Sequence, residues 1–466
     1  MNLIESNRMK WSKYIEFFFV FFICFQPFLD VLAFLDLPFS ELIRVAAMGI
    51  GCIYVLLLPK SKMKNFALTY LVVLGVFICS HFVNNFLVKE PFNLGQEVNY
   101  IIKTLFVVIM LIIYPLIFQS IIKKDNWQEI IQRNIFISMS IIGIIMLIAD
   151  LTSTGKRSYG QLVKEGHSGW FFSGNELSAI LAMGLSLMIL YMIKKNNLKH
   201  KILLLPFIIV VAWSSLQIGT KVGLGACVFV LGVAFIGILI AQIIKKGQFI
   251  NALFIGGLLI ATLAYVPISP VWNNMNVMVE DTGEDDLGEF DNGLGEGEDE
   301  SFPEGNVDEN GEPKANHSIL QNKWVIKLLS GRANFFENTL TQFENSPNSQ
   351  KILGMGIGGN YETEEQMKLI EIDYFDWFFG YGILGSIILF SLFIFYGFFI
   401  IKGIVDRLKL KNVNISYLLV FVSVGLGLGV AFFAGHVLLN PASGIYLAIA
   451  LAYLYVLSIH PSDKLK

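Results

Sequence analysis

Residues 370–385 read Ile370-Glu-Ile-Asp-Tyr-Phe-Asp-Trp-Phe-Phe-Gly-Tyr-Gly-Ile-Leu-Gly385, and here a long hydrophilic stretch gives way to apolar sequence. The stretch begins near Pro270 and is the one long departure from an otherwise apolar chain. Its first third, from Glu280 to Glu312, holds fifteen carboxylates and no basic residue. We expect the rest of the chain to be a scaffold that holds this stretch on one side of a membrane.

The composition excludes an ordinary soluble domain. The chain has 466 residues, of which 55% are hydrophobic and 15% are charged, and its mean hydropathy is +0.62. Soluble domains carry about 25% charged residues. Apolar runs of about 20 residues recur, and each can cross a bilayer as a helix that satisfies its own backbone hydrogen bonds. The sequence therefore predicts an all-α polytopic membrane protein. The four cysteines lie inside these runs, which argues against a disulfide framework.

Twelve predicted spans divide the chain into three parts. Residues 1–269 carry spans one to nine, residues 270–373 form a large loop, and residues 374–466 carry the last three spans. Within the loop, residues 280–313 are predicted to be an acidic flexible segment and residues 317–372 an ordered helical part. The expected spans are 15–36, 40–58, 66–88, 98–120, 130–151, 175–193, 201–217, 220–244, 249–268, 374–401, 415–437 and 441–459.

The basic residues favour one orientation of these spans. Lys and Arg collect at the N-terminus and in every second connection, whereas the other connections are poor in them. Because basic loops tend to stay in the cytoplasm, both termini are predicted to be cytoplasmic and residues 270–373 to be extracytoplasmic. The basic clusters are Arg8/Lys10/Lys13, Lys60/Lys62/Lys64, Lys123/Lys124/Arg133, Lys194/Lys195/Lys199/Lys201, Lys245/Lys246 and Lys402/Arg407/Lys409/Lys411.

The second half of the loop is predicted to form two short amphipathic helices. Ser330 is predicted to be an N-cap, and Pro347 with the glycine-rich turn after it to end the second helix. The amides of Gly354–Gly359 could approach an anion, or these glycines could merely make a turn. The large apolar residues at helical spacing are Trp324, Leu328, Phe336, Leu340 and Phe343.

No metal site is predicted. Asn306-Val-Asp-Glu-Asn-Gly311 resembles the start of a calcium loop. The twelfth position of that register is His317, where the loop geometry needs a bidentate glutamate. A solvated acidic spacer explains the run better.

Five cations on the predicted outer side stand out against the positive-inside trend. Lys103 lies early in span four, Lys221 begins span eight, Lys156 and Arg157 lie in the 152–172 loop, and Arg332 lies in the large loop. Two or three such cations can neutralise a pyrophosphate leaving group without a metal ion. We therefore predict a pyrophosphate site. Alternatively, Lys103 and Lys221 reach along apolar surface to the interface, and Arg332 is a solvated helix residue.

Acids and a histidine collect on the same side. Glu371 and Asp373 flank the re-entry into span ten, where either could act as general base towards a sugar hydroxyl, although acids at a helix start also favour its dipole. His436, which ends span eleven, is a further candidate for the site or a structural residue. Asp30 is predicted to pair with a cation or to cap a broken helix turn. Asn175 is predicted either to join the site or to cap span six.

This pattern resembles the O-antigen ligase and Wzy-type polysaccharide polymerase family of bacterial envelopes. The matching elements cover most of the chain and follow the family's order, within a twelve-span layout that has a large late loop. They are Gly169-Trp-Phe-Phe-Ser-Gly-Asn-Glu176, Ile218-Gly-Thr-Lys221 (where the family often has Ser-Arg), Ser330-Gly-Arg332, Leu353-Gly-Met-Gly-Ile-Gly358, Glu371-Ile-Asp373 and Tyr381-Gly-Ile-Leu-Gly385.

The resemblance implies a membrane glycosyltransferase of the broad GT-C kind in the bacterial cytoplasmic membrane. Such enzymes join a glycan carried on undecaprenyl pyrophosphate to an acceptor glycan, outside the membrane and without nucleotide sugar, metal or cofactor. It implies that Lys221 and Arg332 contact the pyrophosphate. Lys221 keeps the charge of the family's arginine without its bidentate geometry. Glu371, eleven residues before Gly382, falls where ligases of this family usually have a loop histidine.

The favoured function is a polymerase of lipid-linked repeat units for a capsule, exopolysaccharide or O-antigen. A ligase that moves the finished glycan onto another acceptor is the alternative within the same class. A transporter or flippase is a less favoured alternative, since twelve spans with both ends inside is also a transporter layout, but a major-facilitator protein would carry its long loop and basic motif in the cytoplasm. A surface binding or signalling protein leaves the outer cations unexplained. The expected partners are the undecaprenyl-pyrophosphate-linked oligosaccharide, membrane lipid, and flippase and chain-length regulator proteins, with no nucleic acid.

Overall fold

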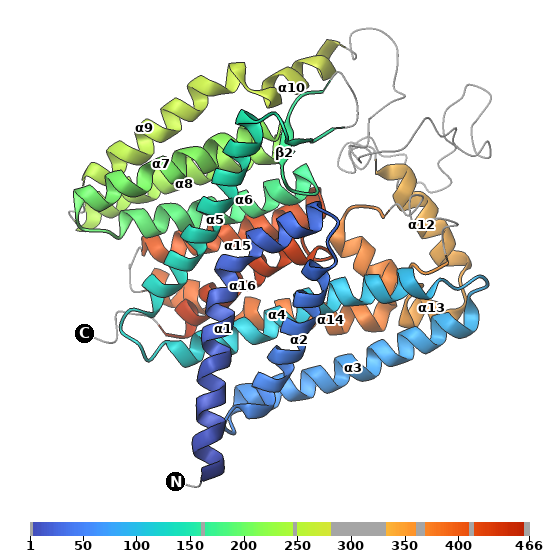
Figure 1. The fold of residues 1–466 in the computed structure, drawn as a ribbon. Coiled ribbons are helices and arrows are strands. Elements are labelled where there is room, and N and C mark those ends of the chain that lie inside the picture. Colours follow the sequence, from blue (N-terminus) through green and yellow to red (C-terminus); the bar gives the residue numbers. More distant parts are fainter. Residues whose placement is uncertain are drawn as a thin grey trace.

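The structure, a computed structural model, is a bundle of long helices (Figure 1). It describes residues 3–159, 164–245, 249–280, 332–359, 369–409 and 414–460. In chain order the elements are α1 (Leu3–Phe34), α2 (Phe39–Leu57), α3 (Lys62–Val88), α4 (Leu94–Ile121), α5 (Trp127–Leu151), β1 (Lys156–Arg157), β2 (His167–Gly169), α6 (Gly174–Ile193), α7 (Leu198–Gln217), α8 (Lys221–Lys245), α9 (Phe249–Tyr265), the 3-10 helix η1 (Val266–Ile268), α10 (Pro270–Glu280), α12 (Ala333–Asn345), α13 (Asn348–Leu353), α14 (Asp373–Lys409), α15 (Ile415–Phe433) and α16 (Pro441–Ile459).

Twelve of the described helices are long and apolar enough to span a membrane, namely α1 to α9 and α14 to α16. This confirms the predicted fold class of an all-α polytopic membrane protein. The helices α4, α6 and α16 form the centre of the bundle. In the most apolar 18-residue stretch of each, 83%, 100% and 89% of the residues are buried, whereas the value for α9 is 22%. Figure 1 shows α7, α8 and α9 on one side of this centre and α2 and α3 on the other. Helices that are apolar all round can lie either inside such a bundle or against lipid.

Two predicted span boundaries in the last third are wrong. The tenth span continues to Lys409, and its helix α14 is broken at Gly382, whose φ is 67°. The eleventh span ends at Phe433, since residues 434–440 form a turn before α16. Gly435 explains the earlier end of the eleventh span, and Gly382 explains the break in α14, because a positive φ interrupts a right-handed helix at little cost only where no Cβ is present.

The described part of the large loop after residue 331 contains the helices α12 and α13, which differ in detail from the prediction. The N-cap position of α12 is Arg332 and not Ser330. Helix α12 ends at Asn345, just before Pro347 as predicted, but a further short helix, α13, separates Pro347 from the glycine-rich turn. The aromatic face of α12 packs on α14 as its helical spacing predicts, with Phe336 against Phe375 at 4.9 Å between ring centroids. The acidic run 281–312 and the predicted helix around Trp324 lie outside the described residues.

One end of the bundle collects the connections that matter for the site. Figure 1 shows α10, α12, α13 and the β1–β2 pair at this end, whereas the C-terminus lies at the other. The turn between α15 and α16 and the start of α14 belong to the same end, because successive spans alternate in direction. The charged residues that the sequence analysis singled out as site candidates therefore share one end of the molecule.

Candidate functional site

A charged site forms where three segments meet at this end of the bundle. Arg332 lies at the start of α12, Glu371 lies two residues before α14, and His436 lies in the turn between α15 and α16. Arg332 Nη2 donates a hydrogen bond to Glu371 Oε2 at 3.3 Å, and its Nη1 donates to the Phe433 carbonyl oxygen at 2.9 Å. His436 Nε2 lies 3.8 Å from Glu371 Oε1. The three side chains are 15%, 14% and 24% exposed, so a small ligand can reach them.

The backbone at this site is strained. Glu371 and His436 have φ angles of 60° and 62°, a region that residues with a Cβ rarely adopt. Such conformations cost about 1–3 kcal/mol each and collect at functional sites. Between them, Gly435 has a φ of 67°, and a Cβ built there would lie 2.6 Å from the Glu371 carbonyl oxygen. Only glycine therefore lets the α15–α16 turn approach Glu371 this closely.

Asp373 holds the turn that carries His436. Its carboxylate accepts hydrogen bonds from the backbone N–H groups of His436, Val437 and Leu438 at 3.0, 2.8 and 2.7 Å. Consecutive amides that converge in this way form an anion-binding concavity. The Asp373 side chain fills that concavity from within the protein and is almost fully buried. Its geometry is that of a positioning residue.

The charges at the site shift the pKa values of Glu371 and His436 in opposite directions. Burial alone raises the pKa of Glu371, but the charges of His436 and Arg332 outweigh it and hold this pKa below its usual range. Burial lowers the pKa of His436, and the carboxylates of Glu371, Asp373 and Glu176 outweigh it and raise this pKa. Both Glu371 and His436 are therefore ionised at least between pH about 4.3 and about 6.5, the ordinary pKa values of glutamate and histidine.

A second group of charges lies in the spans behind this site. The buried carboxylate of Glu176, in the first turn of α6, lies near Asn440 and faces the positive charges of Arg44, His436 and Lys103. Lys103 is therefore placed beside Glu176. Buried charged groups within a span are costly unless they pair, and they are functional candidates for that reason.

Asp30 belongs to the same buried group. Arg44 Nη2 donates a hydrogen bond to Asp30 Oδ1. Of the two alternatives predicted for Asp30, pairing with a cation is therefore the one that the structure shows. Neither Arg44 nor Glu176 was predicted from the sequence. Arg44 did carry a signal, since it is another cation at the outer end of a span. Glu176 carried none of its own, because an acid in a first helical turn is ordinary.

The remaining predicted residues lie in other turns at the same end. Lys221 is exposed at the start of α8, and the adjacent Thr220 hydroxyl bonds the Ser178 hydroxyl of α6 at 2.6 Å. This bond fixes the start of α8, where Lys221 lies, to α6, the helix that carries Glu176. Arg157 lies in β1 and donates to the Lys164 carbonyl oxygen at 2.9 Å. The N-cap position of α6 is Ser173, so the prediction that Asn175 caps this helix is wrong.

The glycine turn after α13 binds an anion of the protein itself. The backbone N–H groups of Ile357 and Gly358 donate to Glu97 Oε2 at 2.9 and 2.7 Å, and Glu97 Oε1 lies 2.7 Å from His81 Nε2. Those two amides are therefore occupied by a side chain of α4. The His81–Glu97 pair is fully buried and fixes this turn to α3 and α4.

Two polar atoms of the site are still available to a ligand. Within the described ranges, Arg332 Nε and His436 Nε2 are buried and have no hydrogen-bond partner. Native proteins satisfy most buried polar groups, so these two atoms indicate where a polar ligand would be held. In the same ranges, no group of three or more His, Cys, Asp or Glu side chains is arranged to hold a metal ion.

Comparison with protein families matches residues 12–459 to the family described as O-antigen ligase like membrane protein. The match covers nearly the whole chain and every residue of the site. Comparison with curated proteins gives no match. The family supports a membrane protein that processes glycans, of glycosyltransferase type.

Proposed function

We propose that this chain, which belongs to the O-antigen ligase-like membrane proteins, is a polymerase of lipid-linked polysaccharide repeat units. It would transfer a growing glycan from undecaprenyl pyrophosphate to the end of another lipid-linked unit. The observation that carries the proposal is the convergence of Arg332, Glu371 and His436 on a strained backbone. Both termini would be cytoplasmic, and the end of the bundle that carries the site would face outward, as the basic loops favour.

The proposed reaction is a single displacement at the anomeric carbon of the donor sugar. An acceptor hydroxyl oxygen forms a bond to this carbon while the bond from the carbon to the pyrophosphate oxygen breaks. Glu371 takes the hydroxyl proton, and the pyrophosphate leaves with the electron pair. Such a displacement inverts the configuration of the sugar. Asp373 is less suited to the role of base, because three backbone amides already bind its carboxylate.

Arg332 supports the leaving group in this scheme. Its Nη1 and Nη2 donate hydrogen bonds to Phe433 and Glu371. The buried Nε has no hydrogen-bond partner in the described residues and is a further donor for a phosphate oxygen. Lys221 would supply a second cation from the start of α8, with Lys103 behind it. Fixed cations of this kind stabilise the charge that develops on a leaving pyrophosphate and need little reorganisation during the reaction.

A ligase is the second candidate, and one observation favours it. Ligases of this family usually carry a histidine where Glu371 stands, and His436 lies 3.8 Å from Glu371. A histidine from another segment therefore reaches the same site. A transporter is the third candidate, and the products of the assay below separate all three.

The test uses the full chain in proteoliposomes with lipid-linked repeat units extracted from cells that lack it. A ladder of lengthened lipid-linked glycans supports the polymerase, whereas transfer of whole chains to a different acceptor supports the ligase. Movement of unchanged substrate across the bilayer, without new bonds, would overturn both. Glu371→Gln should lose at least about 100-fold in rate, within the range of general base catalysis. The matched control is Glu344→Gln, which removes an exposed carboxylate from α12 and should keep the rate.

A further inference from the structure

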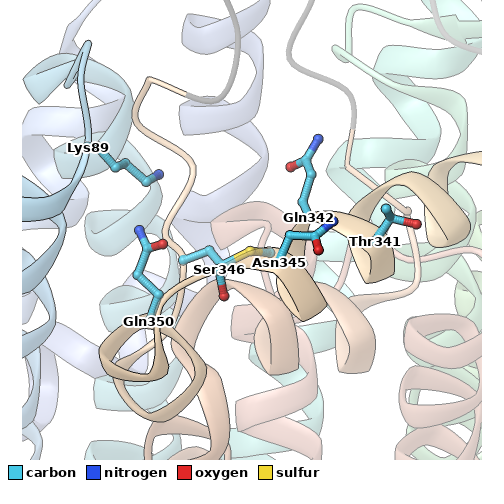
Figure 2. Close-up of a pocket in the computed structure, with 7 residues that line it drawn as sticks. Lys89, Thr341, Gln342, Asn345, Ser346 and Gln350 are labelled. Atoms are coloured by element: carbon cyan, nitrogen blue, oxygen red, sulfur yellow. The ribbon is translucent and has the colours of Figure 1, made fainter. Parts of the chain in front are cut away.

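An open pocket lies beside α12, away from the charged site. It has a volume of about 400 Å³, presents both polar and apolar surface, and is lined by Lys89, Thr341, Gln342, Asn345, Ser346, Gln350 and Met355. Figure 2 shows Lys89 and Gln350 on one side of the pocket and Thr341, Gln342 and Asn345 on the other. This volume falls within the range of about 300–1,000 Å³ typical of small-ligand pockets.

The pocket is built from fixed parts. Gln350 Nε2 donates to Asn85 Oδ1 at 2.9 Å, and Lys89 Nζ donates to the Gly358 carbonyl oxygen at 3.0 Å. The turn that contains Gly358 is itself held by the buried Glu97 carboxylate. On the opposite wall, α12 is anchored to α14 by aromatic contacts such as Phe343 with Phe379, at 5.3 Å between ring centroids. Both walls are therefore held in place before any ligand arrives.

The lining chemistry fits a sugar. Three carboxamides and the Thr341 hydroxyl are groups that donate and accept hydrogen bonds, as sugar hydroxyls do, whereas the Ser346 hydroxyl already donates to the Phe343 carbonyl oxygen and can only accept. Among the described residues that line the pocket, Lys89 is the one cation, which is too few for a pyrophosphate, for which two or three cations converge. None of these described lining residues carries a carboxylate, which disfavours a divalent cation, whose preferred ligands are carboxylate oxygens.

The pocket is remote from the reacting groups. Arg332 precedes α12, and Thr341 to Asn345 form its last five residues. At 1.5 Å per residue, the pocket lies roughly 14–20 Å along the helix axis from Arg332. A sugar bound there cannot be the one that reacts at Glu371. It would be a sugar further along the same glycan.

We propose that this pocket is a subsite for a non-reacting sugar of the lipid-linked glycan, an inference that rests on the proposed glycan-transfer function. The subsite holds the glycan in register while its end reacts at Glu371. Interactions of this kind hold substrate and transition state equally, so losing them raises KM and leaves kcat unchanged.

The test combines direct binding with kinetics on the full-length protein. The probe is the free repeat-unit oligosaccharide, released by mild acid from the cells' own lipid-linked pool. The variant is Gln342→Ala with Asn345→Ala, two exposed positions on α12. The matched control is Asn338→Ala, which removes a carboxamide from an exposed position of the same helix outside the pocket. Thermal unfolding of all proteins checks that they remain folded.

We expect the double variant to bind the oligosaccharide about tenfold more weakly, a change of about 1.4 kcal/mol, and to show a similar rise in KM for whichever of the two lipid-linked substrates, growing chain or single repeat unit, occupies the pocket. Asn338→Ala and Arg332→Ala should bind the probe as the wild type does. Wild-type binding by the double variant would overturn the subsite. Loss of binding in Arg332→Ala would overturn its separation from the charged site.

Two further readouts complete the test. Shorter products at unchanged KM for the single repeat unit would show that the pocket holds the growing chain. A raised KM for that unit at unchanged product length would show that it holds the acceptor. If Arg332→Ala still polymerises at the wild-type rate, the proposed pyrophosphate site fails, while the binding result still decides whether the pocket takes a sugar.

Discussion

Replacing Arg332 by alanine removes the cation on which the proposed chemistry depends. Two hydrogen bonds are lost, from Nη2 to Glu371 and from Nη1 to the Phe433 carbonyl, together with the buried Nε that has no partner in the described residues. Removing one preorganised donor to a developing negative charge costs about 2.7–4 kcal/mol, or about 100- to 1,000-fold in kcat. The loss of folding stability is smaller, about 1–2 kcal/mol, because both charged partners are partly exposed and solvent screens their interaction.

The assay is polymerisation in proteoliposomes, measured beside thermal unfolding of the same preparation. Arg332→Lys keeps the charge but cannot make the same forked contacts, so its rate should lie between those of the wild type and Arg332→Ala. The control is Lys199→Ala, which removes an exposed cation at the opposite end of the bundle and should change neither quantity. A rate for Arg332→Ala within about threefold of the wild type would refute the role of Arg332, since the estimate above requires at least about 100-fold.

Three other changes test the geometry of the site. His436→Gln removes a charge that lowers the pKa of Glu371, so Glu371 should become protonated at higher pH and the acid limb of the kcat/KM profile should move upward; an unmoved limb would contradict this. Gly435→Ala places a Cβ 2.6 Å from the Glu371 carbonyl oxygen, so we expect at least about tenfold lower activity, and a normal rate would show that the turn tolerates displacement. Gly356→Ala places a Cβ 2.3 Å from Glu97 Oε1, so the unfolding temperature should fall while Gly225→Ala, with open space around it, leaves it unchanged; equal temperatures would mean that the glycine turn is not held by Glu97.

The candidate site could be predicted in part because its cations lie on the predicted outer side, whereas most basic residues of the chain lie in the predicted cytoplasmic loops. Arg332 and Lys221 stand out as cations on the predicted outer side, and Glu371 stands out at the start of a span. Glu97 did not stand out, since an acid in a first helical turn is ordinary. Its partners in the glycine turn lie 260 and 261 residues away. No local pattern could therefore show that the turn already holds an anion.

The class of the fold and the number of spans follow from the amino-acid sequence alone. The physical reason is that the thickness of a bilayer fixes the length of each apolar run, and that runs of this length need no distant partner to be helical. The pattern of charge at the span ends likewise predicts that Arg332, Glu371 and His436 share one side. These are properties of short segments.

Which of these residues meet, and what each one does, depends on tertiary packing. Glu371 and His436 come together because Gly435 permits the close approach and Asp373 binds three amides of the α15–α16 turn. The same packing separates Asp373, which positions the turn, from Glu371, which stays accessible beside Arg332. Contacts between distant segments set these distances. Neighbouring acids that look equivalent in the sequence thus acquire different roles.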